Sequence, residues 1–413
     1  MLINSSTFEH LKIDRMGVMI LKNLSHDFQY IEDVVSIVGK EYDVEREILR
    51  SDISLFFQEL QEAGYLEIID EIKPKALTLE LTKQCNERCV HCYIPNKKKN
   101  TGGHLNINTI EKILSEFKSI GGENISITGG EALLSPHFFS TISLANSLGF
   151  NISVLSNLCL LTVKSADLFA VNNVQMVQTS IYGANAEVHD KITGLKGSFD
   201  KTLKAIGLLK ERNIDVRVVF VLLKANASML IDAIKLFKNK YSIDLDIETV
   251  MTPAYDRTTE NLSERLSIAD MKIVLQSLRD FDYEKFIKTV KIRSKQKLIS
   301  GSPTFIIEPA CDGLHQSIYL TSEGELVTCP NFQLYSFGNV NNDSLTDILR
   351  NPTSLKVRGV NVGDFEKCLK CDAYEYCKWC MGQSYVETGK FTETVPFWCD
   401  QALMIKKLAE EKD

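Results

Sequence analysis

Three cysteines, Cys85, Cys89 and Cys92, lie within one short segment of the chain. Three thiolates at this spacing can bind three irons of a cubane iron–sulfur cluster, and the fourth iron then has no protein ligand. Such an iron can bind a substrate or a cofactor. The spacing therefore predicts a cluster that takes part in chemistry, and not only one that stabilises the fold.

A zinc site is the main alternative for these three cysteines. Zinc sites usually combine paired C-x₂-C units with a fourth ligand. Here three residues separate Cys85 from Cys89, and the next cysteine along the chain is Cys159. Both features favour the open cluster over zinc and over three unrelated buried thiols.

Small and polar residues stand at the ends of the next three predicted strands. Gly129 and Gly130 allow a ligand to approach the backbone, and Glu131 offers a carboxylate to an ammonium group. Ser156-Asn157 can form hydrogen bonds with a sugar or a carboxylate, and Ser180 stands on the following strand. Each group alone is equally typical of a turn or a solvated side chain. Their common position at the carboxyl ends of strands favours one shared site.

Seven of the eleven cysteines lie in the last quarter of the chain. A zinc ribbon places about fifteen to twenty residues between its two C-x₂-C pairs, and here the gap is much shorter. Because cytosolic thiols are kept reduced, cluster ligation explains them better than disulfides. They are Cys311, Cys329, Cys368, Cys371, Cys377, Cys380 and Cys399.

Composition restricts the class of protein. A length of 413 residues suggests two or three domains, and a hydrophobic content of 44% is sufficient for buried cores. The net charge of −7 does not favour nucleic-acid binding, and the basic triplet Lys97-Lys98-Lys99 is interpreted as a solvated loop. No secretory signal or membrane-spanning stretch is visible, so we expect a cytoplasmic protein with no membrane partner.

Alternating strands and helices must position the candidate residues. Six β–α units in sequence predict an α/β fold with a parallel sheet or a partial (β/α)₆ barrel, in which sites gather at the carboxyl ends of the strands. Residues 311–400 show weak periodicity and are expected to fold around metal. The predicted strands are 76–81, 125–128, 152–155, 174–181, 216–223 and 245–249, and the predicted helices are 106–119, 136–148, 163–170, 198–212 and 227–240.

The first 75 residues are predicted to form a separate module. An extended start at 8–13 precedes three helical patterns, Gly64 is the expected stop of the last helix, and 65–69 reads as a strand. The acidic content of this module argues against DNA binding. The three helical patterns cover 16–23, 31–38 and 47–63.

Taken together, the triad and the strand-end groups resemble the radical S-adenosylmethionine (SAM) superfamily. Its C-x₃-C-x₂-C motif matches Cys85, Cys89 and Cys92, and the aromatic Tyr93 follows directly. The resemblance implies a partial barrel of radical SAM type whose open iron chelates the amino and carboxylate groups of SAM.

The same resemblance implies roles for the strand-end groups. The segment Gly129-Gly130-Glu131 would contact the methionine amino group, and Ser156-Asn157 would contact the ribose or the carboxylate. Tyr93 and Ser180 complete the expected cofactor site. Many relatives have an arginine where this chain has Lys191-Ile192-Thr193, so part of the SAM carboxylate contact stays unassigned.

The distal cysteines resemble the SPASM domain, which binds two auxiliary iron–sulfur clusters. The family pattern implies that the inner cluster has three cysteine ligands, Cys311, Cys329 and Cys380. Its fourth ligand is then Asp312, His315 or, less favoured, Cys159, or the position is open to a substrate thiolate. Two residues precede Cys380 where the family usually has three. The outer cluster is assigned Cys368, Cys371, Cys377 and Cys399.

The N-terminal module resembles a PqqD-like recognition element with a winged-helix-like fold. Such modules bind the leader of a precursor peptide by adding it as a strand beside the last helix. A generic winged-helix or dimerisation module is the alternative. The expected domains are therefore 1–75 for leader recognition, 76–300 for the radical SAM barrel and 301–413 for the SPASM domain.

These resemblances imply an enzyme that matures a ribosomal peptide. With SAM and three [4Fe-4S] clusters it would generate a 5′-deoxyadenosyl radical and install a crosslink, with a thioether favoured, using electrons from a flavodoxin- or ferredoxin-type donor. Carbon–carbon crosslinking is the first alternative. Sulfatase-maturase-like oxidation is less favoured, because Pro330 and Asn331 stand where that family has an aspartate. A metal-binding winged-helix regulator is the non-enzymatic alternative.

Overall fold

The computed structural model describes residues 2–3, 10–11, 13–23, 31–42, 44–63, 73–291 and 309–411. The chain divides into two compact units, one made of residues 1–72 and 352–359 and the other of residues 73–351 and 360–413. Gly64, the predicted strand 65–69 and half of the predicted extended start at 8–13 lie outside the described residues. None of the described helices is long and apolar enough to cross a lipid bilayer.

The N-terminal unit contains the three predicted helices. They are α1 (Arg15–Asn23), α2 (Ile31–Val38) and α3 (Arg46–Glu62). Two short strands, β1 (Leu2–Ile3) and β2 (His10–Leu11), pair in antiparallel fashion. Apolar residues at helical spacing form the core of this unit. The core residues are Ile20, Val34, Val35, Val38, Leu49, Ile53, Phe57 and Leu60.

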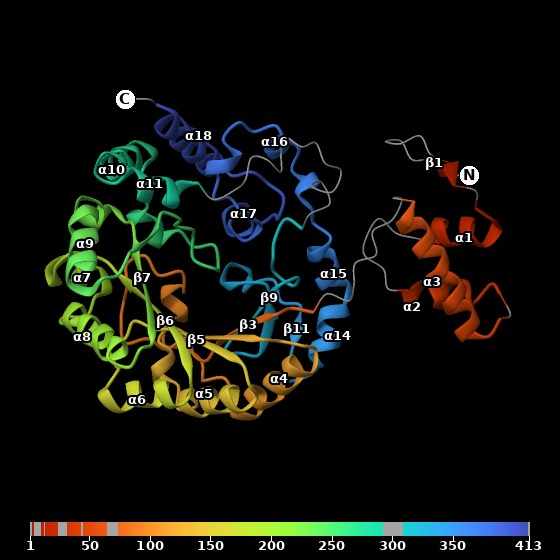
Figure 1. Ribbon diagram of the computed structural model, residues 1–413, viewed down its shortest axis with the longest axis horizontal. Helices are drawn as coiled ribbons and strands as arrows, with labels where there is room; N and C mark the ends of the chain where they lie inside the picture. The colour runs from red at the N-terminus through yellow and green to blue at the C-terminus, as the bar shows by residue number, and fades with distance from the viewer. Residues whose placement is uncertain are drawn as a thin grey trace. The chain divides into compact units, whose positions relative to one another are not determined.

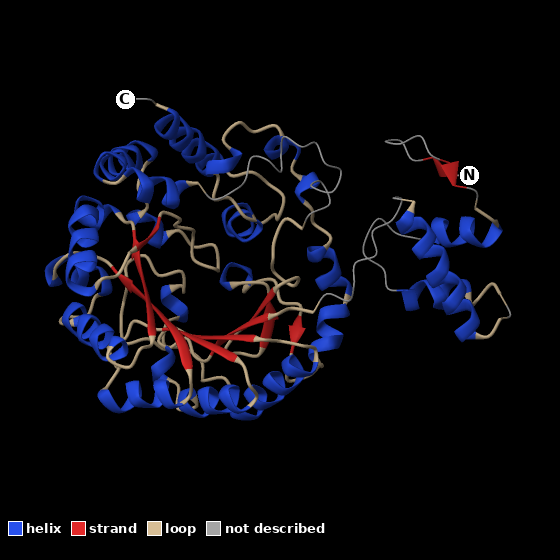
Figure 2. Cartoon of the chain, viewed as in Figure 1, coloured by secondary structure: helices blue, strands red, loops and turns tan. Residues whose placement is uncertain are grey.

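The second unit is built on one nine-stranded sheet. Six consecutive strands of this sheet are parallel and follow the order of the chain, so the predicted α/β fold with a partial (β/α)₆ barrel is confirmed. The strands form an open arc (Figure 2). The six strands are β3 (Ala76–Glu80), β4 (Asn124–Thr128), β5 (Asn151–Leu155), β6 (Val174–Ile181), β7 (Asp215–Val221) and β8 (Asp246–Glu248).

Helices cover the outer side of this arc (Figure 1). One of them, α7 (Ala186–Thr193), was not predicted because it is short and its apolar positions are few; Asn185 caps it by accepting a hydrogen bond from the backbone N–H of Val188 at 3.1 Å. The predicted helix 227–240 is divided into η3 (Lys224–Met229), α9 (Leu230–Leu236) and η4 (Phe237–Tyr241). The other helices here are α4 (Ile107–Ser119), α5 (Phe138–Ser147), α6 (Val163–Val171) and α8 (Ser198–Lys210).

The C-terminal segment continues the barrel sheet. Strand β9 (Ser317–Leu320) pairs in parallel with β3, and β10 (Glu325–Val327) and β11 (Gly338–Asn339) extend the same sheet. The expectation that this segment folds around metal did not include this pairing. Residues of β9 and β10 such as Leu320 and Val327 are fully buried, so part of its core is an extension of the barrel core.

Further helices follow the barrel strands and the C-terminal strands. They are α10 (Ile268–Phe281), α11 (Tyr283–Val290), α14 (Leu345–Arg350), α15 (Pro352–Arg358), α16 (Glu366–Leu369), α17 (Met381–Thr388) and α18 (Pro396–Glu410).

Candidate active site

The segment from Cys85 to Tyr93 is a loop that begins just after the carboxyl end of β3. Other loops hold it in place. The backbone N–H groups of Arg88 and Val90 donate to the carbonyls of Thr193 and Ile192 at 2.7 and 3.1 Å. The unpredicted helix α7, which ends at Thr193, therefore positions the cysteine loop.

The cysteine loop lines a cleft of about 550 Å³, a size typical of small-molecule sites. The cleft brings together almost all of the residues predicted for the barrel site. Of these, only Glu131 does not line it. The predicted residues that do line it are Cys85, Cys89, Cys92, Tyr93, Gly129, Gly130, Ser156, Asn157 and Ser180.

Close packing of the chain against itself explains Gly129 and Gly130. A Cβ atom on Gly130 would lie 2.6 Å from the carbonyl oxygen of Gln84, and one on Gly129 would lie 2.8 Å from that of Thr82. The backbone N–H of Gly130 donates to the Thr82 carbonyl at 2.7 Å. These glycines thus let the end of β4 approach the start of the cysteine loop, besides lining the cleft.

The carboxylate of Glu131 is buried and bound to the chain. Its Oε1 accepts hydrogen bonds from the backbone N–H of Leu133 at 3.0 Å and from the Ser156 hydroxyl at 2.8 Å. Its Oε2 accepts one from the backbone N–H of Asn157 at 2.8 Å. Burial raises the pKa of Glu131, although these hydrogen bonds act in the opposite direction. Glu131 therefore positions Ser156 and Asn157, and its contact with a ligand ammonium stays a prediction.

Asn157 lies directly beside the cysteine loop. Its Nδ2 donates to Asn86 Oδ1 at 2.9 Å and is 3.9 Å from Cys85 Sγ. On the next strand, Ser180 forms a side-chain hydrogen bond with Tyr182, whose ring centroid is 4.7 Å from that of His91. Each of the three strand ends thus contacts or faces the cysteine loop.

The three thiols of the loop fit a cluster electrostatically. Burial raises the pKa of Cys85 to about 12 and raises the pKa values of Cys89 and Cys92, and the charge of Cys92 raises those of Cys85 and Cys89 further. Thiolates at these positions therefore require a bound cation, which a cluster iron provides. In the described residues no three His, Cys, Asp or Glu side chains converge on a single metal ion. Ligands of a cubane bind separate corners and need not converge.

Comparison with known proteins assigns the fold. Residues 79–237 match the radical SAM superfamily, and residues 311–381 match the SPASM iron–sulfur cluster-binding domain. The chain therefore resembles radical SAM enzymes over its barrel and iron–sulfur SPASM domains over its distal cysteines.

Several known proteins resemble this chain over most of its length. An AdoMet-dependent heme synthase of Methanosarcina barkeri is 24% identical over 348 residues, which cover 78% of this chain and 96% of that protein. The antilisterial bacteriocin subtilosin biosynthesis protein AlbA of Bacillus subtilis is 28% identical over 313 residues, which cover 74% of this chain and 67% of AlbA.

Solved structures share the fold. The structure of anSMEcpe with bound AdoMet has a TM-score of 0.63 and 20% identity, and covers 81% of this chain and 97% of its own. Streptococcus suis SuiB bound to precursor peptide SuiA has a TM-score of 0.59 and 15% identity, and covers 95% of both chains.

The cysteines of the SPASM segment, residues 311–399, fall into two groups by the charges that act on them. Burial raises the pKa of Cys311 to about 11 and that of Cys329 to about 12, and the charge of Cys380 raises both further. In the second group, burial and then the charges of Cys377 and Cys371 raise the pKa of Cys399. Cys368 lies one turn from Cys371, whose N–H donates to its carbonyl at 3.1 Å. The roles of these cysteines as ligands of an inner and an outer cluster stay a prediction.

The three protein groups considered for the fourth inner ligand differ in their surroundings. His315 is buried and Asp312 is exposed, and both are close in sequence to Cys311. The thiol of Cys159 instead contacts Glu87 Oε1 at 3.4 Å and Thr202 Oγ1 at 3.8 Å, both on the barrel. Glu87 was missed by the sequence analysis; burial raises its pKa to about 7.

The SPASM segment supplies part of the cleft wall. Cys329, Pro330 and Asn331 line the same cleft as the cysteine loop. Cys329, one of the three cysteines expected to bind the inner cluster, therefore lies at the same cleft as the triad. The distal cysteines are thus not all remote from the barrel site.

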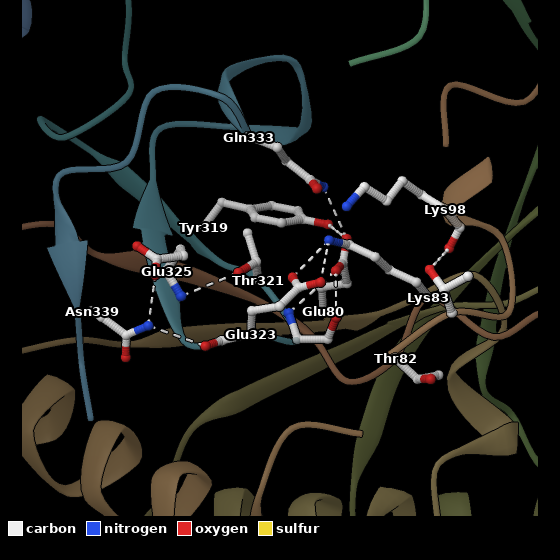
Figure 3. Close-up of polar contacts among 12 residues, drawn as sticks. Glu80, Thr82, Lys83, Lys98, Tyr319, Thr321, Glu323, Glu325, Gln333 and Asn339 are labelled. Atoms are coloured by element: carbon white, nitrogen blue, oxygen red, sulfur yellow. Dashed lines mark hydrogen bonds and ion pairs between the residues drawn. The ribbon is translucent and has the colours of Figure 1, made fainter. Parts of the chain in front are cut away.

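A buried polar network joins the two walls of the cleft (Figure 3). Glu80, the last residue of β3, is fully buried and accepts four hydrogen bonds, all from the SPASM segment. The donors are the Tyr319 hydroxyl at 2.9 Å, Gln333 Nε2 at 3.0 Å, and the N–H and hydroxyl of Ser322 at 3.2 and 2.9 Å. Tyr319 also forms a hydrogen bond with Tyr93.

Lys83 adds an ion pair to this network. Its ammonium lies 2.6 Å from both carboxylate oxygens of Glu323 and 5.3 Å from the centroid of the Tyr255 ring. Glu80, Lys83 and Tyr93 flank the cysteine loop on both sides, so the SPASM segment holds both ends of that loop. No sequence motif marked Glu80 or Lys83, because their partners are more than two hundred residues away.

Proposed function

We propose that this chain is a radical SAM maturase that installs a thioether crosslink in a ribosomally made precursor peptide. One observation carries the proposal: a single cleft is lined by Cys85, Cys89 and Cys92 on one wall and by Cys329 on the other. A peptide residue in this cleft is within reach of both cysteine groups. The resemblance to AlbA, a bacteriocin biosynthesis protein, supports a peptide substrate.

The cofactor set of the proposal is SAM with three [4Fe-4S] clusters. SAM bound at the open iron of the first cluster would supply a radical that removes hydrogen from carbon. The first ligand set is the triad, and the other two are the inner and outer cysteine groups of the SPASM segment. The chain's part is to exclude water and to hold the target carbon close to the cofactor, while Asn157 and Ser180 bind polar groups of the cofactor.

Three inner cysteines leave one corner of the inner cluster for a further ligand. In the thioether proposal a cysteine thiolate of the peptide takes this position, which brings sulfur beside the target carbon. Crosslinking would then transfer one hydrogen atom from carbon to the deoxyadenosyl radical and release one proton from the thiol, and the electron left over as the carbon–sulfur bond forms would pass to the auxiliary clusters. A flavodoxin- or ferredoxin-type protein is the proposed electron donor, in a cytoplasmic setting.

The N-terminal unit is proposed to bind the leader of the precursor. Its helix α3 buries Leu49, Ile53 and Leu60 but exposes Ile48 and Leu55, which are 52% and 58% exposed. These two side chains are seven residues apart and therefore share one face of the helix. This exposed apolar face of α3, the last helix of the three, suits a peptide that is added as a strand beside that helix. The proposed domains are 1–75, 76–300 and 301–413.

The test is anaerobic co-expression with a small open reading frame adjacent to the gene, followed by mass spectrometry of the peptide. A thioether predicts the loss of two hydrogens and of one alkylatable thiol for each crosslink. Hydrogen loss with every thiol still alkylatable would instead support carbon–carbon crosslinking. An unchanged peptide mass, with SAM cleaved by the wild type and not by Cys89→Ala, would reject the peptide substrate.

A further inference from the structure

The basic triplet Lys97-Lys98-Lys99 is not one solvated patch. Lys97 pairs with Asp256, with Nζ and Oδ2 2.9 Å apart, and Lys98 is exposed. Lys99 is half-buried and lines the cleft. The three neighbouring lysines therefore have three different environments, and only the last faces the candidate active site.

A short turn directs Lys99 to the cysteine loop. The turn contains η1 (Asn96–Lys98), and the N–H of Lys99 donates to the Pro95 carbonyl at 3.1 Å. The next residue, Asn100, accepts a hydrogen bond from the backbone N–H of Cys85 at 2.8 Å. The turn is thus attached to the first cysteine, and the Lys99 ammonium reaches the carbonyl of the second, Cys89, at 3.2 Å.

The position of the Lys99 ammonium follows from the cleft lining and from its hydrogen bond. Lys99 lines the same cleft as Cys85, Cys89 and Cys92. Its ammonium donates to the Cys89 carbonyl, which stands between the first and third cysteines of the loop. The ammonium therefore lies beside the part of the cleft that the triad encloses.

The other lysine of the cleft is already neutralised. Lys83 forms its ion pair with Glu323 at 2.6 Å. Lys99 has no carboxylate within ion-pair distance among residues 73–291 and 309–411. In that part of the chain its ammonium makes one hydrogen bond, to the Cys89 carbonyl, which leaves other donors of the ammonium available to a ligand.

We infer that Lys99 binds the carboxylate of SAM beside the open iron of the triad cluster. The inference rests on the proposed SAM site. Lys99 would supply the cation that many relatives take from an arginine, which is absent from Lys191-Ile192-Thr193 in this chain. A carboxylate that enters this cleft loses hydrogen bonds to water, which costs free energy. A charge-assisted hydrogen bond from the Lys99 ammonium offsets that cost.

The test compares two ligands on reconstituted holoenzyme without peptide. SAM carries the carboxylate, and 5′-methylthioadenosine has the same nucleoside without the amino-acid part. Lys99→Gln is expected to weaken SAM binding about tenfold to a hundredfold, since one hydrogen bond to a charged group is lost. It should change 5′-methylthioadenosine binding less than about twofold, whereas Lys99→Arg should retain most SAM affinity. The matched control is Lys98→Gln, on the same turn but exposed, which should change neither affinity.

Each other outcome would overturn the inference. Equal weakening of both ligands would mean that Lys99 shapes the cleft, and loss of iron in Lys99→Gln would mean that it only holds the cysteine loop. Unchanged SAM affinity with a raised KM for the peptide would assign Lys99 to a peptide carboxylate. Because SAM affinity is measured without peptide, an unmodified peptide rejects the proposed function but not the role of Lys99.

Discussion

The two walls of the cleft are built in different ways. The barrel wall consists of the cysteine loop and the ends of β4, β5 and β6, which lie next to each other because consecutive parallel strands place their carboxyl ends together. The SPASM wall contains Cys329 and Asn331 and reaches the cleft through β9, which pairs with β3. One wall follows from local order in the chain, and the other depends on a long-range pairing held by Glu80 and Lys83.

The largest expected effect separates the chemistry of the two walls. Cys89→Ala should lower 5′-deoxyadenosine formation by at least about a hundredfold. The reason is that removing a cluster ligand costs more activity than changing a residue that surrounds the ligands. Cys329→Ala should leave SAM cleavage within about tenfold of wild type but abolish peptide crosslinking. Deoxyadenosine, peptide mass and iron content are measured together. Equal loss of SAM cleavage in both variants would contradict separate tasks for the two walls.

The second prediction breaks the connection between the walls. Glu80→Ala removes a buried carboxylate and leaves four donors of the SPASM segment without their acceptor. We expect the free energy of unfolding of the apo protein to fall by about 3 kcal/mol. Urea titration measures it. The control is Glu123→Ala, since Glu123 is an exposed carboxylate that pairs with Lys75 at 2.8 Å, and should cost less than about 1 kcal/mol. Similar losses of unfolding free energy in the two variants would show that Glu80 is not the main connection between the two walls.

The third prediction concerns packing within the barrel wall. Gly130→Ala would place a methyl group 2.6 Å from the Gln84 carbonyl oxygen and 2.8 Å from that of Lys83. Both contacts are with backbone, so the cysteine loop must shift, and we expect a loss of about 2–3 kcal/mol. Gly103→Ala is the matched control, because a Cβ atom there meets no atom within 4 Å. Retention of wild-type stability and iron content in Gly130→Ala would show that the cysteine loop can shift to accommodate the methyl group without a loss of stability.

The smallest expected effect is a pH dependence of the barrel wall. His189, in α7, is buried, and its Nδ1 accepts a hydrogen bond from the backbone N–H of Tyr182 at 3.2 Å. Burial lowers the pKa of His189 to about 4, while the neighbouring Asp190 opposes this shift. In the unfolded chain the histidine is protonated near pH 6.5, whereas in the folded chain it stays neutral until about pH 4. The free energy of unfolding therefore falls as the pH drops from about 6.5 toward 4.

Between pH 7.5 and pH 5 this single group should cost about 2 kcal/mol. His189→Gln removes that part of the loss, so its urea midpoint should fall less steeply with acid than that of the wild type. A parallel decrease in both proteins would show that other groups dominate the acid sensitivity of the fold.

The sequence was informative where function depends on short spacings. The triad, the Gly129-Gly130 pair and Ser156-Asn157 could be recognised because each is contiguous, and the order of parallel strands then predicts that they meet. Helix α7 and Lys99 escaped detection because a short helix has few periodic positions and a lysine triplet has the same sequence whether it faces solvent or a cleft. Glu131 was assigned to a ligand, but its carboxylate accepts three hydrogen bonds from the chain itself.

By itself the sequence determined the partial barrel and the spacing of the cysteine triad, since hydrophobic periodicity and ligand spacing are local properties of the chain. The two distal cysteine groups were predicted from the resemblance to the SPASM domain. Only the tertiary structure decided that β9 joins β3, that Cys329 shares the cleft of the triad, and that Glu80 and Lys83 connect the two walls. Hydrogen bonds and ion pairs across more than two hundred residues leave no periodic trace in a single sequence. They arise when the folded sheet brings their partners together.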